Sequence, residues 1–141
     1  MSAYRPKNFI LQELVMPEVY QERGERAWEL LDARALLMLQ MLRHAFGPIV
    51  VNNWHDGGEY KESGLRSFEC STGAKLSQHK FGRAFDCKSR NATPYEMRDF
   101  VIGKQERFPY LTTIEDPQYT PTWFHFDTRL HHLDKILIVK P

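Results

Sequence analysis

The chain has 141 residues, of which 42% are apolar, and a net charge of +1. This length suits one hydrophobic core, so we expect residues 1–141 to form a single domain. The balanced charge, without a run of basic residues, excludes the strong field typical of nucleic-acid-binding proteins and of proteins held on anionic membranes. We expect no nucleic-acid partner, no membrane insertion and a monomer.

The N-terminus and the cysteines indicate a cellular setting. Residues 1–8 lack the apolar core of a secretory signal peptide, so we expect synthesis in the cytoplasm. The apolar segments are too short and too interrupted to span a bilayer. Cys70 and Cys87 are the two cysteines. Two cysteines are too few for a disulfide framework, and a cytosolic protein keeps such thiols reduced.

The first third of the chain predicts one long helix followed by a strand. Residues up to Tyr20 hold scattered apolar side chains and two prolines, a pattern typical of a short helix or an irregular arm. From Glu25 to Phe46 the apolar side chains recur at helical spacing, and Gly47 followed by proline would end that helix. Residues 49–54 begin with a β-branched run that predicts a short buried strand.

The rest of the chain predicts a long loop, four strands and a second helix. Residues 55–73 are rich in glycine, serine and charge, and loops of this length are usually functional. Thr93 and Glu96 flank Pro94 as in a capping box, which predicts a helix to about Arg107. The predicted strands are residues 84–88, 111–115, 122–129 and 136–139. The expected fold is α+β: a small, mainly antiparallel sheet with a long N-terminal helix and a second helix.

His79 and Asp86 have the residue types and the spacing of two metal ligands. His79 lies in a polar turn before Gly82, and Asp86 lies in the predicted strand after that glycine. A reversal of the chain at the turn would bring both side chains to one point. Zinc binds histidine nitrogen and carboxylate oxygen in a tetrahedral site, and catalytic sites keep one position open for water.

A third ligand candidate lies in the segment Trp-Phe-His-Phe-Asp near the C-terminus. Alternation along a strand would put Trp123, His125 and Asp127 on one face and Phe124 and Phe126 on the other. We expect the phenylalanines to be buried in the core and His125 to face a cleft as the third ligand. Asp127 would then orient the second ring nitrogen of His125, as ligating histidines usually require.

The other candidate ligands have simpler explanations. We expect His131 and His132 on the surface and His55 in the long loop. Cys87 follows Asp86 directly, so on a strand it would face the opposite side. Short metal motifs also occur by chance, and a single histidine in a chain with six is more often not a ligand.

Three segments, in order, resemble a known family. The pattern Ser-x-His-x-x-Gly-x-Ala-x-Asp is followed by Trp-x-His-x-Asp, and Ser-Gly-Leu-Arg at residues 63–66 is similar to the Ser-Gly-Tyr-Arg segment of the same proteins. The family that these segments resemble is that of the zinc D-Ala-D-Ala carboxypeptidases and L-alanyl-D-glutamate peptidases, which act on bacterial cell walls. Its wider fold group includes the metal-binding domain of hedgehog proteins. The matching residues are Ser77, His79, Gly82, Ala84, Asp86, Trp123, His125 and Asp127.

This resemblance implies a role for each matching residue. The two histidines and Asp86 would hold Zn²⁺, and Ser77 and Trp123 would contact the substrate. Arg66 would bind the substrate and stabilise the oxyanion that develops during peptide hydrolysis. The alternative for Arg66 is a loop arginine in a surface ion pair.

The chain departs from the family pattern at the catalytic base. Many members carry an acidic residue three positions before the final histidine ligand, where this chain has Thr122. Glu115 is therefore the candidate base, and Asp116 is the second choice. The alternative for both acids is an ordinary turn before Pro117. In that case no acid would reach the water, and the site would bind zinc without catalysis.

The resemblance implies a zinc metallopeptidase that hydrolyses the stem peptide of peptidoglycan at the D-Ala-D-Ala or the L-Ala-D-Glu bond. We expect an endolysin-like protein of a bacteriophage or prophage, released to the cell wall by a lysis partner. Two alternatives remain open. One is a non-catalytic structural or virion-associated zinc module, favoured if His55 or Cys87 completes a four-ligand shell. The other is a zinc hydrolase with a different substrate.

Overall fold

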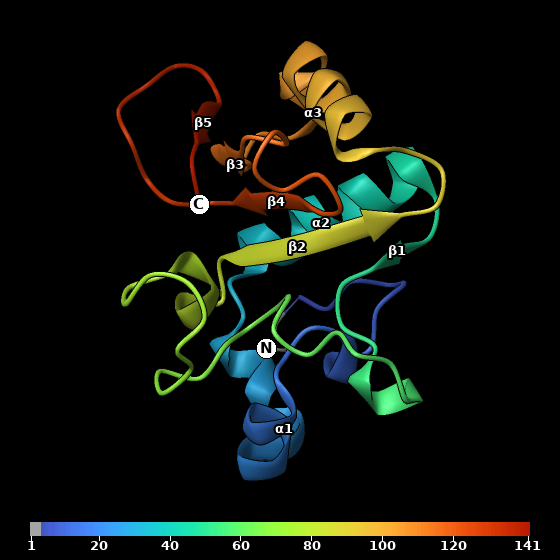
Figure 1. Ribbon diagram of the computed structural model, residues 1–141, viewed down its shortest axis with the longest axis vertical. Helices are drawn as coiled ribbons and strands as arrows, with labels where there is room; N and C mark the ends of the chain where they lie inside the picture. The colour runs from blue at the N-terminus through green and yellow to red at the C-terminus, as the bar shows by residue number, and fades with distance from the viewer. Residues whose placement is uncertain (1–3) are drawn as a thin grey trace.

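Residues 4–141, which the computed structural model describes, form an α+β fold with a five-stranded sheet and three α-helices (Figure 1). The first three residues of the expected domain, and of the N-terminus examined for a signal peptide, lie outside the described part. The helices are α1 (Pro17–Arg23), α2 (Ala33–Phe46) and α3 (Pro94–Gly103). The strands are β1 (Ile49–Val50), β2 (Ala84–Ser89), β3 (Thr113–Glu115), β4 (Phe124–Asp127) and β5 (Leu137–Val139).

The sheet is mixed, so the expectation of a mainly antiparallel sheet is wrong. The strand order is β1-β2-β4-β3-β5, and β5 pairs with β3 in parallel. Strands β3 and β5 run in one direction, and β4, which lies between them in the sequence, runs in the opposite direction. Because β2 already occupies the other edge of β4, β5 pairs on the far side of β3 and runs in the same direction as β3.

The predicted long N-terminal helix does not form, because the chain breaks at Leu31 and Asp32. Gly24–Leu30 is a 3₁₀ helix, Leu31 is extended, and α2 begins only at Ala33. The Asp32 carboxylate accepts a hydrogen bond from the Arg34 amide and caps α2, while the Asp32 amide donates to the Gly82 carbonyl. Aspartate favours such a capping position over the helix interior. The apolar residues keep their helical spacing across this break, so the sequence pattern does not reveal it.

Most other elements form as predicted but are shorter, whereas β2 runs one residue beyond the predicted strand. Thr93 and Glu96 make the predicted capping box of α3, which ends at Gly103 before a separate 3₁₀ turn, Gln105–Arg107. The strand predicted for residues 49–54 stops at Val50. Beyond it the buried Asn52 side chain bonds the Val15 carbonyl and the Ser63 amide, so Asn52 ties two other segments together instead of extending the ladder.

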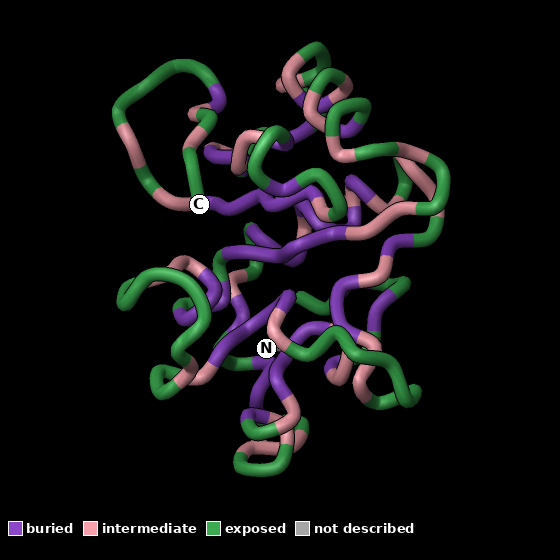
Figure 2. The backbone as a smooth tube through the Cα atoms, viewed as in Figure 1, coloured by how far each residue is buried: buried purple, intermediate pink, exposed green. Residues whose placement is uncertain are grey.

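The core lies between the sheet and α2. Phe85 on β2, with Phe124 and Phe126 on β4, is fully buried, as are Leu39 and Leu42 on α2. Figure 2 shows this buried stretch running along β2 and β4. The predicted alternation along β4 is thus confirmed for its two phenylalanines. Within residues 4–141, no helix has the length and apolar character needed to cross a membrane.

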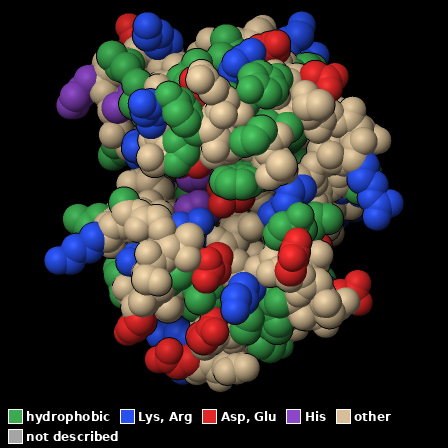
Figure 3. Space-filling view, viewed as in Figure 1, with side chains coloured by type: hydrophobic (Ala, Val, Ile, Leu, Met, Phe, Trp, Pro, Cys, Tyr) green, Lys and Arg blue, Asp and Glu red, His purple; other side chains and the backbone are tan. Residues whose placement is uncertain are grey.

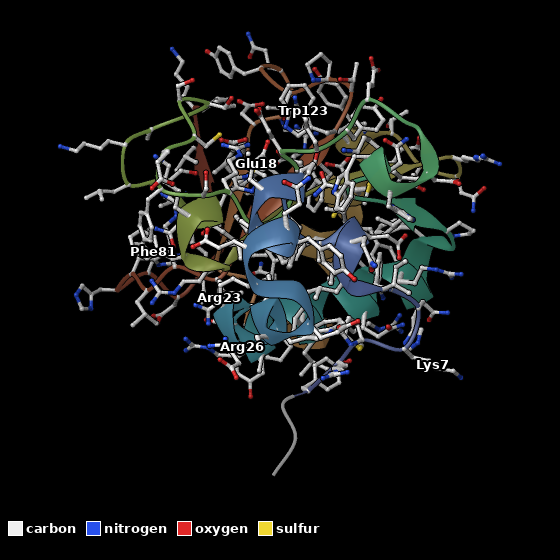
Figure 4. The ribbon with its side chains drawn as sticks, turned by 90° about the horizontal axis from the view of Figure 1, so that it is seen from below. Lys7, Glu18, Arg23, Arg26, Phe81 and Trp123 are labelled. Atoms are coloured by element: carbon white, nitrogen blue, oxygen red, sulfur yellow. The ribbon has the colours of Figure 1, made fainter. Side chains whose placement is uncertain are left out.

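The N-terminal segment packs beneath the sheet and holds the long loop in place. It includes the 3₁₀ turn Leu11–Glu13 and α1, on which Glu18 and Arg23 are labelled in Figure 4. Val15 forms a parallel bridge with Leu65, and this bridge places the following residue of the loop next to β2. Of the two expectations for this segment, a short helix or an irregular arm, the short helix is present as α1.

Candidate metal centre

His79, Asp86 and His125 come together as predicted. All three are buried, and one ligand atom from each lies within 4.8 Å of the others. Asp86 on β2 is the direct antiparallel partner of His125 on β4. His79 comes from the 3₁₀ helix Gln78–Phe81, which precedes β2. This buried group could hold a metal ion.

Hydrogen bonds fix the orientation of the His79 ring. The Ser77 hydroxyl accepts a hydrogen bond from the His79 amide at 3.3 Å and caps the 3₁₀ helix. His79 Nδ1 donates to the Gly64 carbonyl at 2.9 Å. Because Nδ1 is bound to this carbonyl, Nε2 is the ring nitrogen that faces the centre of the group, 3.3 Å from Asp86 Oδ1.

His125 is held from both sides by carboxylates. Its Nδ1 lies 2.9 Å from Asp86 Oδ1, and its Nε2 lies 2.9 Å from Asp127 Oδ2. Asp127 is fully buried and also accepts two hydrogen bonds from the Arg129 guanidinium, at 2.8 and 2.6 Å. Asp127 is thus in the orienting position predicted for it. The sequence analysis did not identify Arg129 as a partner of Asp127, although Arg129 continues the alternation of His125 and Asp127 along the chain.

The buried charges shift the pKa values of the group. Burial disfavours a charged His125, but its hydrogen bonds to Asp127 and Asp86 outweigh burial and raise the pKa of His125 to about 10. Burial also disfavours a charged Asp86, yet His79 and His125 hold the pKa of Asp86 well below its ordinary value. Despite burial, the pKa of Asp127 is lowered by its bonds to His125 and Arg129. A metal ion must therefore displace a proton from His125.

The spacing of the three ligand atoms suits a tetrahedral ion. Bonds of ~2.0–2.1 Å to zinc place neighbouring ligand atoms roughly 3.3 Å apart. The two observed separations from Asp86 Oδ1 are 3.3 Å to His79 and 2.9 Å to His125. Among residues 4–141 the group has three members. His55 is exposed on the 3₁₀ helix Trp54–Asp56, and Cys87 is buried in the hydrophobic core.

Arg66 lies beside the group and is buried, so its alternative role as a surface residue is wrong. Its exposed fraction is 8%, and its Nη2 lies 3.4 Å from Asp86 Oδ2. The Arg66 Nε donates to the Glu62 carbonyl at 2.7 Å, and Nη1 donates to the Thr72 carbonyl at 3.3 Å. Loop carbonyls on both sides of Arg66 therefore direct its guanidinium towards the candidate metal ligand Asp86.

The structure separates the two candidate bases. Glu115 ends β3 beside β4, and its Oε1 lies 3.4 Å from His125 Nδ1. Burial raises the pKa of Glu115, although the nearby His125 acts against this shift. Asp116 instead turns its carboxylate to the Gln118 amide, at 3.0 Å. Of the two acids, Glu115 is the one that reaches the metal group, and Thr122 is exposed.

Two surface cavities adjoin the group: Asp86 lines both, whereas His79 and His125 line the second. The first, of about 480 Å³, is lined by Glu59, Tyr60, Lys61, Glu62, Ser63, Lys88 and Thr122, and we call it the Lys88 arm. The second, of about 350 Å³, is lined by residues 73–74 and 76–79 with Glu115, His125, Arg129 and residues 139–141, and we call it the Arg129 arm. Arg66, Thr72, Asp86 and Trp123 line both.

The surface view agrees with a shared cleft. Figure 3 shows histidine atoms in the hollow that separates the upper and lower parts of this face. Trp123, labelled in Figure 4, contributes to both arms, and Ser77 lines the Arg129 arm. The two residues expected to contact substrate therefore both line a cavity beside the group.

The remaining candidate residues lie apart from the group. His132 is exposed, as predicted, whereas His131 is half-buried and its Nε2 lies 2.7 Å from the Thr112 carbonyl. Cys70 and Cys87 are free thiols.

No model of a known protein family matches the chain, and no curated protein matches it.

Proposed function

We propose that this protein is a zinc-dependent peptidase that hydrolyses a bond in the stem peptide of peptidoglycan. The observation that carries the proposal is the buried group of two histidines and one aspartate lining a surface cavity, with Glu115 and Arg66 beside it. Structural zinc sites usually have four protein ligands, whereas catalytic sites have three. The three-membered group among the described residues supports a catalytic site.

The side chains around the group have complementary roles in this reaction. A zinc ion bound by the three ligands would polarise the scissile carbonyl and make water acidic enough to attack at neutral pH. Glu115 accepts the proton from the attacking water and returns it to the leaving amine as the C–N bond breaks. Its raised pKa suits a group that must take up and release a proton.

Arg66 and the pair Asp127–Arg129 support the same chemistry. The positive charge of Arg66 lies next to Asp86 and favours the negative charge that gathers on the carbonyl oxygen. Asp127, itself held by Arg129, keeps the His125 ring in the orientation that points Nδ1 at the group. The chain thus holds its ligands rigidly before any substrate arrives.

The proposed substrate rests on the three segments that resemble cell-wall peptidases. The same resemblance supports the proposal of an endolysin-like protein of a bacteriophage or prophage, acting at the wall as a monomer after a lysis partner has released it. The cleft provides room for a peptide: each arm alone has the volume of a small-molecule site.

The test is mass spectrometry of purified Gram-negative peptidoglycan after incubation with zinc-loaded protein. The controls are protein treated with a chelator and zinc-loaded Glu115→Gln. We expect zinc-dependent release of peptide fragments by the wild type alone. If protein that holds one zinc per chain leaves the wall intact, the function is instead that of a non-catalytic zinc module or of a hydrolase with another substrate.

A further inference from the structure

Building on the proposed peptidase function, we propose that the protein cuts an internal bond, with substrate groups bound in both the Lys88 arm and the Arg129 arm. It would then be an endopeptidase and would not remove a single C-terminal residue. The basis is that two cavities share the side chains of Asp86 and Arg66, next to the other members of the metal group.

The two arms share four side chains: Arg66, Thr72, Asp86 and Trp123. His79, Glu115 and His125 line the Arg129 arm alone. A peptide whose scissile carbonyl lies between Asp86 and Arg66 can therefore extend into both arms. Its two flanking parts would lie in different arms, whichever direction the peptide runs.

The size of each arm exceeds what a single terminal residue requires. The volumes of about 480 and about 350 Å³ both fall in the ~300–1,000 Å³ range of sites that hold a whole small ligand. An enzyme that removes one alanine needs a leaving-group site that holds a methyl group and a carboxylate and ends there. Neither arm is so small, so both flanks of the bond have room for longer groups.

The wall of the Lys88 arm is preformed. The half-buried Lys88 donates through Nζ to the Val51 carbonyl at 2.7 Å and to the Ser63 hydroxyl at 2.8 Å, and Nζ lies 4.0 Å from the centre of the Tyr60 ring. The Ser63 carbonyl in turn accepts a hydrogen bond from the Asp86 amide at 2.8 Å. These bonds attach the wall to β2 beside the metal ligand, so the arm is a fixed part of the site.

The Arg129 arm is also built from anchored elements. One side is the capped 3₁₀ helix that carries His79, and the other includes the end of β3 at Glu115 and the end of β5 at Val139. The parallel pairing of Glu115 with Val139 holds that second side together. Both arms therefore exist before substrate binds, which lowers the ordering cost of binding an extended chain.

The first experiment uses N-acetylmuramoyl pentapeptide with a free C-terminus and the same compound with a C-terminal carboxamide. Zinc-loaded protein is incubated with each, and the products are identified by mass spectrometry. We expect the same internal bond to be cut in both compounds, at rates within about twofold of each other, because the reacting bond is remote from the blocked end.

Two other outcomes would overturn the inference, and they are distinguishable. Loss of the terminal alanine from the free compound, with the carboxamide uncut, would leave the proposed peptidase function standing but make it a carboxypeptidase. Absence of cleavage of both compounds by zinc-bound protein, with whole peptidoglycan also intact, would overturn the proposed function as well.

A second experiment fills each arm separately. Lys61→Trp and Ala74→Trp change exposed residues that line the Lys88 arm and the Arg129 arm, and Ala33→Trp changes an exposed residue at the start of α2 as the matched control. Zinc content and circular dichroism check that each variant folds. We expect each arm variant to lower kcat/KM on the carboxamide by about tenfold, and the control to stay near wild type. Wild-type kinetics in either arm variant would contradict the use of that arm.

Discussion

The proton on His125 determines how the metal-free site responds to pH. The pKa of His125 is raised from 6.5 to about 10, so its stabilising effect is fully present below pH ~6.5 and is lost as the pH rises towards 10. The pKa values of Asp86 and Asp127 are lowered from 3.8, so their stabilising effect is present above that pH and is lost in acid.

We therefore predict that the metal-free protein is most stable between about pH 4 and 6.5 and loses stability from pH 6.5 to about 8. Above pH 8 the effect of Lys88 opposes that of His125, because burial lowers the pKa of Lys88 to about 8. The measurement is urea unfolding at a series of pH values with a chelator present. Asp127→Asn should reduce the loss above pH 6.5, because it removes one carboxylate that raises the pKa of His125. A free energy of unfolding that rises from pH 6.5 to 8 would contradict the raised pKa of His125.

The displaced proton also predicts that zinc binds more tightly as the pH rises. At neutral pH the His125 ring is protonated, so each zinc ion releases one proton from it, and the affinity should rise by up to about tenfold per pH unit below 10. Calorimetry in buffers with different ionisation enthalpies measures the released protons. An enthalpy that is the same in all buffers would show that His125 is already neutral.

His79 offers a direct test of the ligand set. His79→Ala removes a nitrogen whose orientation is fixed by Gly64, and it should abolish stoichiometric zinc binding. His132→Ala, at an exposed histidine, is the matched control and should keep one zinc per chain. Metal analysis of the dialysed proteins gives the answer. Full retention of zinc by the His79 variant would remove His79 from the ligand set.

Glu115→Gln separates metal binding from catalysis. The amide keeps the size of the side chain but cannot accept a proton, so zinc should remain bound while turnover falls about 10²–10⁴-fold. Asp116→Asn is the control, because Asp116 faces the Gln118 amide, and it should keep nearly full activity. Equal losses in the two variants would mean that Glu115 has no special role.

At the scale of elements, the turn at Gly82 sets the distance between two ligands. Gly82 has a φ of +69°, and a Cβ there would overlap the Leu30 carbonyl. This close approach joins the 3₁₀ helix that carries His79 to the break before α2, since the Asp32 amide donates to the Gly82 carbonyl. The helix break at Leu31 and Asp32, which the apolar spacing does not reveal, therefore helps to support the metal group.

We predict that Gly82→Ala lowers the free energy of unfolding by about 1–3 kcal/mol and weakens zinc binding. The control is Gly103→Ala at the end of α3, where an added Cβ meets nothing within 4 Å. That change should alter stability by at most about 1 kcal/mol. Urea unfolding and zinc titration of both variants give the comparison, and an unaffected Gly82 variant would show that the turn adapts freely.

At the scale of the whole molecule, the metal group joins parts of the chain that are far apart in sequence. Asp86 alone contacts Arg66 of the long loop, His79 before β2 and His125 on β4. Because these segments separate on unfolding, a bound ion should stabilise the native state as a whole.

Zinc at about 100 times its dissociation constant should raise the free energy of unfolding by about 2.7 kcal/mol. Thermal scans with zinc and with a chelator measure the shift in Tm. His79→Ala should show the same Tm in both conditions. A zinc-dependent shift of equal size in that variant would mean that the ion binds elsewhere.

The sequence by itself determined the features that depend on local periodicity and local chemistry. Alternation along β4 separates Phe124 and Phe126 from His125, and Thr93 with Glu96 caps α3 wherever the helix packs. The sequence also predicted His79 and Asp86 as candidate ligands, because these two residues flank one short turn.

Only the tertiary structure decided features that depend on contacts between distant segments. It placed the Glu115 carboxylate beside His125, buried Arg66 between two loop carbonyls, and paired β5 with β3 in parallel. It also formed two cavities that share Asp86. Local periodicity is a property of neighbouring residues, whereas docking and strand pairing are decided by which surfaces meet after the chain has folded.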